Sequence, residues 1–446
     1  MTFPYSKLKT PPQEFIFAPL KAWIKAGLAI RTDRPLIYQL ALIYHLLKPT
    51  DRKVFDREVW KGDICNHFNF PKVRRLSFCY NTVMNEVFRW FRYFPILAGI
   101  VLGFAFVWPC VRRTWARILW AAGLAASLLM FQGYEWFGGS IFRPELPEKL
   151  LWLWSVAYWG ALMLTALAPV CLWWRSKAKV WTLPLVACAI SACGLWNALS
   201  VPGVTEIELR FPDLPTALDG YRIAQISDLH TSGVARRWRT EAIVDKANAL
   251  SPDVICLTGD IADGSVAERL ADAEPLRRLV SRDGVYAVSG NHEFFYDFES
   301  WKRAYAGLGV RVLENACVFP RAGLALGGVN DFSFKGSAFA APDVCAAFES
   351  ATNGEFRVLM QHRPHPTACA GTAVRVDLQL SGHTHGGFMP ILKGLTADVN
   401  GGFLAGVHSV GKGRLVVSSG CGPWPAFPFR YLTPSEIVLV VLRRGE

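Results

Sequence analysis

The sequence predicts a protein of two main parts: about four membrane-spanning helices, followed by an α/β layered domain over residues 201–446. Four long apolar segments between residues 93 and 200 predict the first part. Beyond residue 200, short apolar runs alternate with segments of helical spacing, which predicts layered strands and helices. A chain of 446 residues with 52% hydrophobic and 19% charged residues is too long for one ordinary domain and excludes a disordered chain.

Residues 1–92 form a basic segment of unclear role, with 16 Lys/Arg against 7 Asp/Glu. The apolar stretch 35–47 is too short to span a bilayer and fits an interfacial helix. No signal-peptide cleavage pattern precedes it. One hypothesis is that the natural start is Met84, directly before the first apolar segment.

The four apolar segments each approach the ~20 residues that cross a bilayer. They are about Tyr93–Val111, Ile118–Phe137, Leu150–Trp174 and Val180–Leu199. Tryptophan and tyrosine gather near their ends, as in the interfacial belts of membrane proteins. The first and third loops are the more basic, so the positive-inside rule predicts a multi-pass protein of the bacterial inner membrane with its C-terminal domain on the periplasmic face. The basic N-terminal segment argues for the opposite orientation.

The charge and cysteine content exclude several classes of protein. Residues 201–446 hold 24 Lys/Arg and 26 Asp/Glu, a net charge of −2. A nucleic-acid enzyme usually carries excess positive charge on its catalytic body, so this composition argues against a nucleic-acid partner. The eleven cysteines include no CxxC pair, so neither a disulfide framework nor a zinc ribbon is predicted.

The α/β domain is predicted to contain five buried strands and at least three helices. The strands are Arg222–Ser227, Val254–Thr258, Val285–Ser289, Arg357–Gln361 and Val376–Ser381. The helices are Thr240–Leu250, Ala267–Val280 and Phe298–Leu308. A polar cluster closes every one of these strands, and the ligand site of an α/β sheet lies beyond the carboxyl ends of its strands. We therefore expect the five clusters to converge.

The clusters supply seven potential metal ligands, more than one ion needs. They are Asp228, His230, Asp260, Asn291, His362, His383 and His385. Oxygen and imidazole donors without a thiolate suit Mn²⁺, Fe or Zn²⁺. Two such ions, ~3.5–4 Å apart, would share a bridging carboxylate and clamp a phosphoryl group. The Asp-x-His and His-x-His pairs are expected to point to one side of an extended segment.

The same residues, in the same order, resemble the motifs of the calcineurin-like metallophosphoesterases. The family pattern DxH, GDxxD, GNH[DE], H and GHxH is matched at Asp228/His230, Gly259-Asp260/Asp263, Gly290-Asn291-His292-Glu293, His362 and Gly382-His383/His385. The lead-in from Leu214 and the ending Pro434-Ser-Glu-Ile-Val-Leu are similar to the membrane-associated YkuE-like or YaeI-like branch. The resemblance covers about residues 205–442 and implies a four-layer α/β/β/α sandwich.

The resemblance also implies a role for each residue. Asp228, His230 and His385 would hold one metal, and Asn291, His362 and His383 the other, with Asp260 between them. His292 would act on the phosphoryl group or protonate the leaving oxygen. Asp263 would support the site or cap a loop, and Glu293 would orient His292 or cap the helix that follows.

These implications define the expected function and its alternatives. The leading expectation is a membrane-anchored hydrolase of phosphodiesters or phosphomonoesters, with a lipid- or envelope-related substrate. One alternative is a lipid-linked pyrophosphatase acting on a UDP-diacylglucosamine, which requires the opposite orientation. Another is a non-catalytic membrane protein that binds metal or a partner. The segment Gly420–Tyr431 is either a packed proline-rich loop or an apolar lip for such a substrate.

Overall fold

The computed structural model describes residues 113–129, 146–166, 182–332, 340–365, 374–424 and 428–445, with residues 99, 103, 133 and 136 besides. The basic N-terminal segment, the hypothetical start at Met84 and most of the first predicted span lie outside these ranges.

The other predicted spans correspond to three helices of the described chain. They are α6 (Thr114–Leu128), α8 (Glu148–Ala166) and α10 (Thr182–Leu199), of 15, 19 and 18 residues. Within the described ranges, no helix combines the length and the apolar character that crossing a bilayer requires. The helices nevertheless expose large apolar side chains, including Leu153 at 70%, Leu185 at 72% and Trp196 at 74%.

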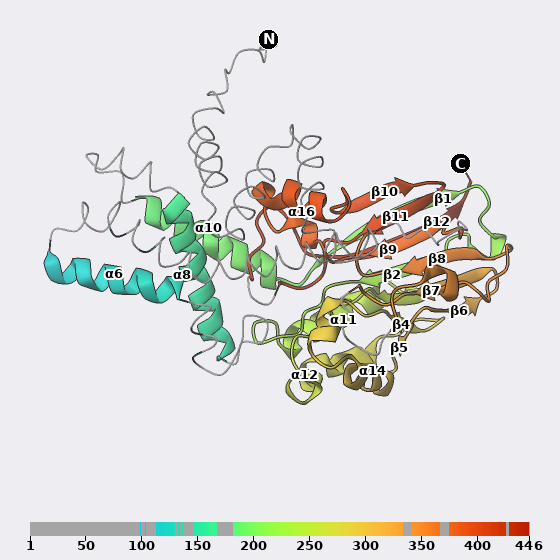
Figure 1. Cartoon of the computed structure of the whole chain (residues 1–446), viewed down its shortest axis with the longest axis horizontal. Coiled ribbons are helices and arrows are strands. Elements are labelled where there is room, and N and C mark those ends of the chain that lie inside the picture. Colours follow the sequence, from blue (N-terminus) through green and yellow to red (C-terminus); the bar gives the residue numbers. More distant parts are fainter. Residues whose placement is uncertain are drawn as a thin grey trace, which may run out of the picture. The chain divides into compact units, whose positions relative to one another are not determined.

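The α/β domain is a sandwich of two mixed six-stranded sheets (Figure 1). The first has the order β1-β12-β2-β3-β4-β5, formed by Gly203–Phe211, Glu436–Arg444, Arg222–Ile226, Val254–Leu257, Val285–Ala287 and Arg311–Val312. The second has the order β10-β11-β9-β8-β7-β6, formed by Gly406–Val410, Gly413–Val417, Leu378–Ser381, Phe356–Met360, Leu324–Gly328 and Ala316–Arg321. The five predicted strands are confirmed as β2, β3, β4, β8 and β9.

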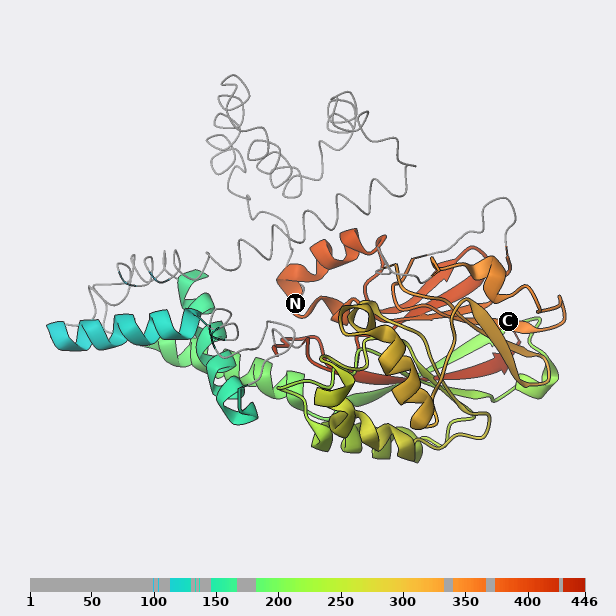
Figure 2. The same ribbon diagram turned by 60° about the horizontal axis from the view of Figure 1, so that its bottom comes forward.

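Helices cover the outer faces of both sheets. The helices α11 (Arg237–Ala249), α12 (Val266–Ala273) and α14 (Phe298–Gly307) lie together on one side of the domain (Figures 1 and 2). Buried residues of α11 and α14, such as Val244 and Trp301, share one apolar core with Ile255 of β3. The short α15 (Val344–Ala347) packs in a separate core with Leu359 of β8. The predicted helix Ala267–Val280 is wrong in its length, because Pro275 follows α12 and a 3₁₀ turn, η5 (Glu274–Arg278), replaces the last turns.

The apolar core between the two sheets fixes the position of one sheet relative to the other. Apolar side chains from β2, β3 and β12 meet those of β7, β8 and β9 there, and most of them are fully buried. One polar contact crosses the same core, where Gln225 of β2 donates to the carbonyl of Ser381 in β9 at 2.8 Å. The parallel strands β2, β3, β4 and β8, β9 therefore end at a common edge, where the polar clusters follow them.

Candidate metal centre

The strand-end loops bring six of the seven predicted ligands together as two groups of donors, all of them buried except His383, which is half-buried. Asp228, His230 and His385 form the first group, which is called the first pocket below. Asp260, His362 and His383 form the second group, which is called the second pocket. In each group the ligand atoms lie within 4.8 Å of one another.

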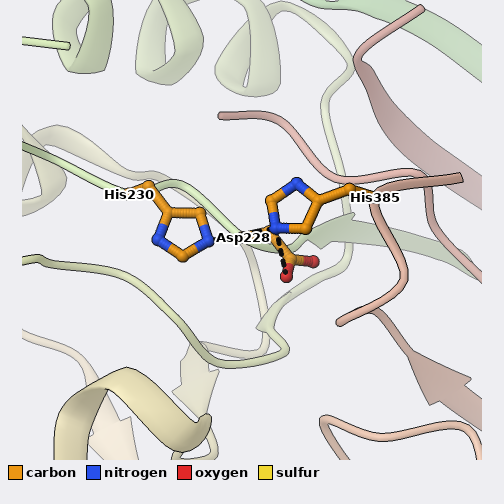
Figure 3. Close-up of side chains that lie close together, drawn as sticks. All are labelled: Asp228, His230 and His385. Carbon is orange, nitrogen blue, oxygen red and sulfur yellow. Dashed lines mark hydrogen bonds and ion pairs between the residues drawn. The ribbon is translucent and has the colours of Figure 1, made fainter. Parts of the chain in front are cut away.

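The first pocket is built from the ends of β2 and β9, in different sheets. The two imidazole rings and the carboxylate point toward one another (Figure 3). His230 Nε2 lies 3.2 Å from His385 Nε2, and His385 Nε2 lies 3.5 Å from an oxygen of Asp228. The hydroxyl of Ser227 donates to the other oxygen of Asp228 at 2.6 Å. This arrangement leaves the Nε2 edges of both rings directed at a common point.

Asp260 lies between the pockets. Its Oδ2 atom is 3.2 Å from His362 Nε2 in the second pocket and 3.8 Å from His230 Nε2 in the first. His383 Nδ1 faces His362 Nε2 at 3.2 Å. Asp260 is thus the carboxylate placed to contact ions in both pockets.

The backbone at five of these ligands is in the left-handed region. The φ angles are +51° at Asp228, +48° at His230, +53° at Asp260, +68° at His383 and +48° at His385. The prediction that the two paired motifs are extended is therefore wrong, and His383 and His385 face different pockets. Such residues cost of order 1–3 kcal/mol each, and this strain persists only where the surrounding structure enforces it.

The loop glycine Gly259 allows the strand ends to approach closely. It has φ of +91°, and a Cβ atom there would lie 2.6 Å from the nitrogen of Gly290 and 2.7 Å from His362 Nδ1. His362 Nδ1 in turn lies 2.8 Å from the carbonyl of Thr258, which fixes the ring. Only glycine satisfies both the backbone angle and the space.

His292 and its neighbours stand beside the ligands. His292 Nδ1 is hydrogen-bonded to Asp263, whose other oxygen lies 2.9 Å from His230 Nδ1. His292 Nε2 lies 3.9 Å from Asp260 Oδ2. Asp263 therefore holds the rings of two histidines at once, which its position after β3 in the sequence did not predict.

Glu293 ties two strand-end loops together. It accepts hydrogen bonds from the backbone nitrogens of Gly290 at 2.7 Å, Asp260 at 3.0 Å and Ile261 at 2.7 Å. The first of these is part of the capping box of the helix α13 (Asn291–Phe295). Of the two roles expected for Glu293, the structure places it as a cap.

The carboxylates of the centre favour positive charge on two of its histidines, His362 and His292. Burial lowers the pKa of His362, but the carboxylates of Asp260 and Asp228 outweigh it and raise the pKa to about 10. For His292, the charges of Asp260 and Asp263 likewise outweigh burial and raise the pKa to about 9. A negative potential that stabilises two imidazolium ions would also stabilise divalent cations.

A buried asparagine oxygen is a further indication that these residues can hold a pair of metal ions. The side-chain oxygen of Asn291 is buried and has no hydrogen-bond partner among the residues that the structure describes. An unpartnered buried oxygen is costly, and an adjacent cation would satisfy it. Asn291 follows β4 and precedes His292, whose backbone N–H donates to Asp260 at 2.8 Å.

One buried residue at this centre was missed in the sequence. Arg430 is fully buried, and its Nη2 atom lies 3.1 Å from His385 Nδ1. It belongs to the segment Gly420–Tyr431, whose sequence suggested either a packed loop or an apolar lip. No sequence motif indicates that Arg430, which lies among aromatic and proline residues, contacts His385, 45 positions earlier in the chain.

Comparison with known proteins assigns the domain to a family. Residues 221–387 match the profile of the calcineurin-like phosphoesterases. A zebrafish (Danio rerio) protein called "Transmembrane protein with metallophosphoesterase domain" is 31% identical over 272 residues, which cover 58% of this chain and 62% of that one. An "Uncharacterized metallophosphoesterase" of Helicobacter pylori is 29% identical over 56% of this chain and 66% of its own length. YkuE of Bacillus subtilis is 28% identical over 54% of this chain and 85% of its own.

This chain therefore carries a calcineurin-like metallophosphoesterase domain, which confirms the resemblance seen in the five motif blocks. It is similar to both transmembrane and YkuE-type members of that family. The matched region covers less than two thirds of the length of the first two relatives.

Proposed function

We propose that this protein is a membrane-associated phosphoesterase that hydrolyses phosphodiester or phosphomonoester bonds at a centre of two divalent cations. The observation that carries the proposal is the placement of Asp260 between two buried groups of donors, 3.2 Å from His362 and 3.8 Å from His230. The first pocket would hold one ion, and His362, His383 and Asn291 the other. Mn²⁺, Zn²⁺ and Fe suit these ligands.

Two bound cations would supply an activated water and neutralise charge on the phosphoryl group. The chain's own residues would do the rest. His292, held at Nδ1 by Asp263, presents Nε2 toward the centre and can give its proton to the leaving oxygen. Asp263 keeps this ring in the orientation that proton transfer requires, and Glu293 holds the loop of Asp260 against that of His292.

The association with a membrane rests on the helices that precede the domain. We propose that residues 93–200 form a transmembrane region of about four helices, with the catalytic domain on the periplasmic face. Exposed large apolar side chains such as Leu153, Leu185 and Trp196 support this, because a membrane would cover them.

A lipid-related substrate is supported by the surface beside the centre. Phe388 stacks on the ring of His385, with centroids 5.0 Å apart. The following elements η7 (Pro390–Leu392) and α16 (Lys393–Val399) expose Ile391 at 84% and Leu395 at 48%. Exposed apolar side chains in the elements that follow His385 would suit acyl chains attached to a phosphate.

The test uses the full-length protein in detergent. After metal removal, it would be supplied with Mn²⁺, Zn²⁺ or Fe²⁺ and given bis-p-nitrophenyl phosphate, p-nitrophenyl phosphate or a phospholipid in mixed micelles. We expect metal-dependent hydrolysis of at least one ester. Full activity in chelator, or metal binding without hydrolysis of any ester, would refute the proposal, and the second result would favour a non-catalytic metal-binding protein.

Two further measurements test the lipid-related substrate and the orientation in the membrane. The double variant Ile391→Ser with Leu395→Ser should lower hydrolysis of the micellar lipid and leave that of the soluble diester unchanged. A topology reporter fused after Ser200 should report the periplasmic side. A cytoplasmic signal would contradict the orientation and favour a nucleotide-sugar pyrophosphatase.

A further inference from the structure

The apolar helices α8 and α10 contact the loops that carry the first pocket. These contacts join segments that the sequence separates into a membrane region and a catalytic domain. They occur at two places, one after His230 and one after β11, where partly buried tryptophans of α8 meet buried residues of the α/β domain.

The first contact supports the loop that follows His230. Trp152 of α8 donates from its indole nitrogen to the carbonyl of Val234 at 3.2 Å. Val234 is fully buried and belongs to the apolar cluster formed by α6 and α8. Trp152 also meets the ring of Trp238 edge-on, with centroids 6.4 Å apart. The backbone four residues beyond His230 is therefore packed into the helical part.

The second contact is a wedge formed by Phe429 and Arg430. The buried ring of Phe429 stacks on Trp159 of α8, with centroids 4.6 Å apart and an interplanar angle of 29°. The same ring fills the space above Gly194 of α10, where a Cβ atom would overlap it. The backbone nitrogen of Arg430 donates to the carbonyl of Gly194 at 2.9 Å. Phe429 and Arg430 thus bind both helices.

The guanidinium of Arg430 contacts the loops that form the first pocket. Its Nη2 lies 3.1 Å from His385 Nδ1 and donates to the carbonyl of Gly422 at 2.8 Å, and its Nη1 donates to the carbonyl of His385 at 3.4 Å. The nitrogen of Gly422 donates to the carbonyl of Asp228 at 2.6 Å. One side chain therefore holds the loops of two ligands, His385 and Asp228.

The second pocket is supported differently. His362 Nδ1 is held by the carbonyl of Thr258, and Asp260 receives the backbone N–H of His292. The loop of Asp260 is fixed in turn by Glu293. These partners belong to the α/β domain. The backbone nitrogen of His383 also donates to Asp228 of the first pocket at 3.1 Å, so the second pocket is linked to the same packing only indirectly.

We infer that the Phe429–Arg430 wedge transmits the packing of α8 and α10 to the first pocket, so that these helices help to set the affinity of that pocket for metal. Arg430 acts as a positioning residue, since it touches a ligand and not the substrate. The inference rests on the proposed function, because it requires that both pockets bind metal.

The experiment measures metal affinity in full-length protein purified in detergent. Calorimetric titration of the metal-free protein with Mn²⁺ gives the stoichiometry and two dissociation constants. The variants His385→Ala and His362→Ala assign these constants to the first and second pockets. Wild-type protein that binds fewer than two ions would refute the proposed function and, with it, the inference about the wedge.

The wedge variants are Phe429→Ala, Arg430→Lys and Gly194→Ala. The substitution at Gly194 lies in α10 and changes no residue of the α/β domain. Partners that orient metal ligands typically contribute about 10- to 100-fold in affinity. We therefore expect a loss of that size in the first pocket, with the second pocket unchanged. The matched control is Phe348→Ala, which removes a buried phenylalanine from the separate core around α15.

Two results would overturn the inference. In one, the wedge variants keep wild-type affinity in the first pocket. In the other, both pockets weaken together and Phe348→Ala weakens them equally, which would indicate a loss of stability only. Thermal unfolding of each metal-free variant confirms that the comparison is made between folded proteins.

Discussion

Replacing Asp260 by asparagine is the sharpest test of the two-cation centre. Asp260 is buried, and its Oδ2 atom lies 3.2 Å from His362 Nε2, 3.8 Å from His230 Nε2 and 3.9 Å from His292 Nε2. Burial raises its pKa, but the imidazoles of His362 and His292 outweigh burial and hold the pKa well below its usual range. Asparagine keeps the shape, and its oxygen can still accept the backbone N–H of His292. The substitution therefore removes one charge and places an NH2 group, which cannot ligate metal, where Oδ2 lies between the pockets.

The expected loss follows from Coulomb's law. Two unit charges about 4 Å apart interact by ~4 kcal/mol at an effective dielectric constant of about 20, which is a lower bound for a carboxylate beside a divalent cation. At about 1.4 kcal/mol for each factor of ten, this corresponds to a loss of about 10³-fold. We expect the variant to show that loss in the hydrolysis of bis-p-nitrophenyl phosphate at an Mn²⁺ concentration that saturates the wild type. The variant should also retain less metal than the wild type after dialysis.

The control is Asp245→Asn, which removes an exposed carboxylate of α11 that pairs with Arg278 at 3.0 Å. Its activity should equal that of the wild type, because exposed pairs contribute little. If Asp260→Asn kept its fold and hydrolysed the diester within tenfold of the wild-type rate, the bridging role would be refuted.

Three other predictions follow from the same geometry. Chelation should abolish hydrolysis and added Mn²⁺ should restore it, as followed by p-nitrophenolate absorbance; activity that survives complete metal removal would contradict the centre. His292→Ala should lower kcat by about 10²- to 10⁴-fold, the usual contribution of a general acid, while both metals remain bound. The loss should be larger for a phenyl ester than for a p-nitrophenyl ester, because the poorer leaving group needs the proton more, and equal losses would argue against proton transfer. Gly259→Ala should destabilise the protein by more than the ~1–2 kcal/mol that left-handed backbone costs an alanine, because its Cβ would lie 2.6 Å from the backbone of Gly290. The control is Gly309→Ala, because Gly309 has φ of +83° but open space around it. Thermal unfolding should show that this variant loses only the ~1–2 kcal/mol of stability that the left-handed backbone costs an alanine.

The elements around the centre could be predicted because their signals are local. Short apolar runs between turns identified β2, β3, β4, β8 and β9 to within one or two residues. The donors that follow these strands were identified by residue type and order, since few packing arguments explain so many histidines at strand ends. The strands β1, β5, β6, β7, β10, β11 and β12 were not predicted, although Ile207, Leu209 and Phe211 of β1 alternate with charged residues and β12 contains a continuous apolar run.

The sequence by itself determined which side chains meet and at which edge of the domain they do so. Only the tertiary structure decided how they divide into two pockets, because the left-handed backbone at ligands such as His383 and His385 turns neighbouring side chains apart. It also placed Arg430 against His385 and joined the helix α10 to the same loop. Side-chain direction depends on backbone angles and on contacts between segments far apart in the chain, and neither is written in a local pattern of residue types.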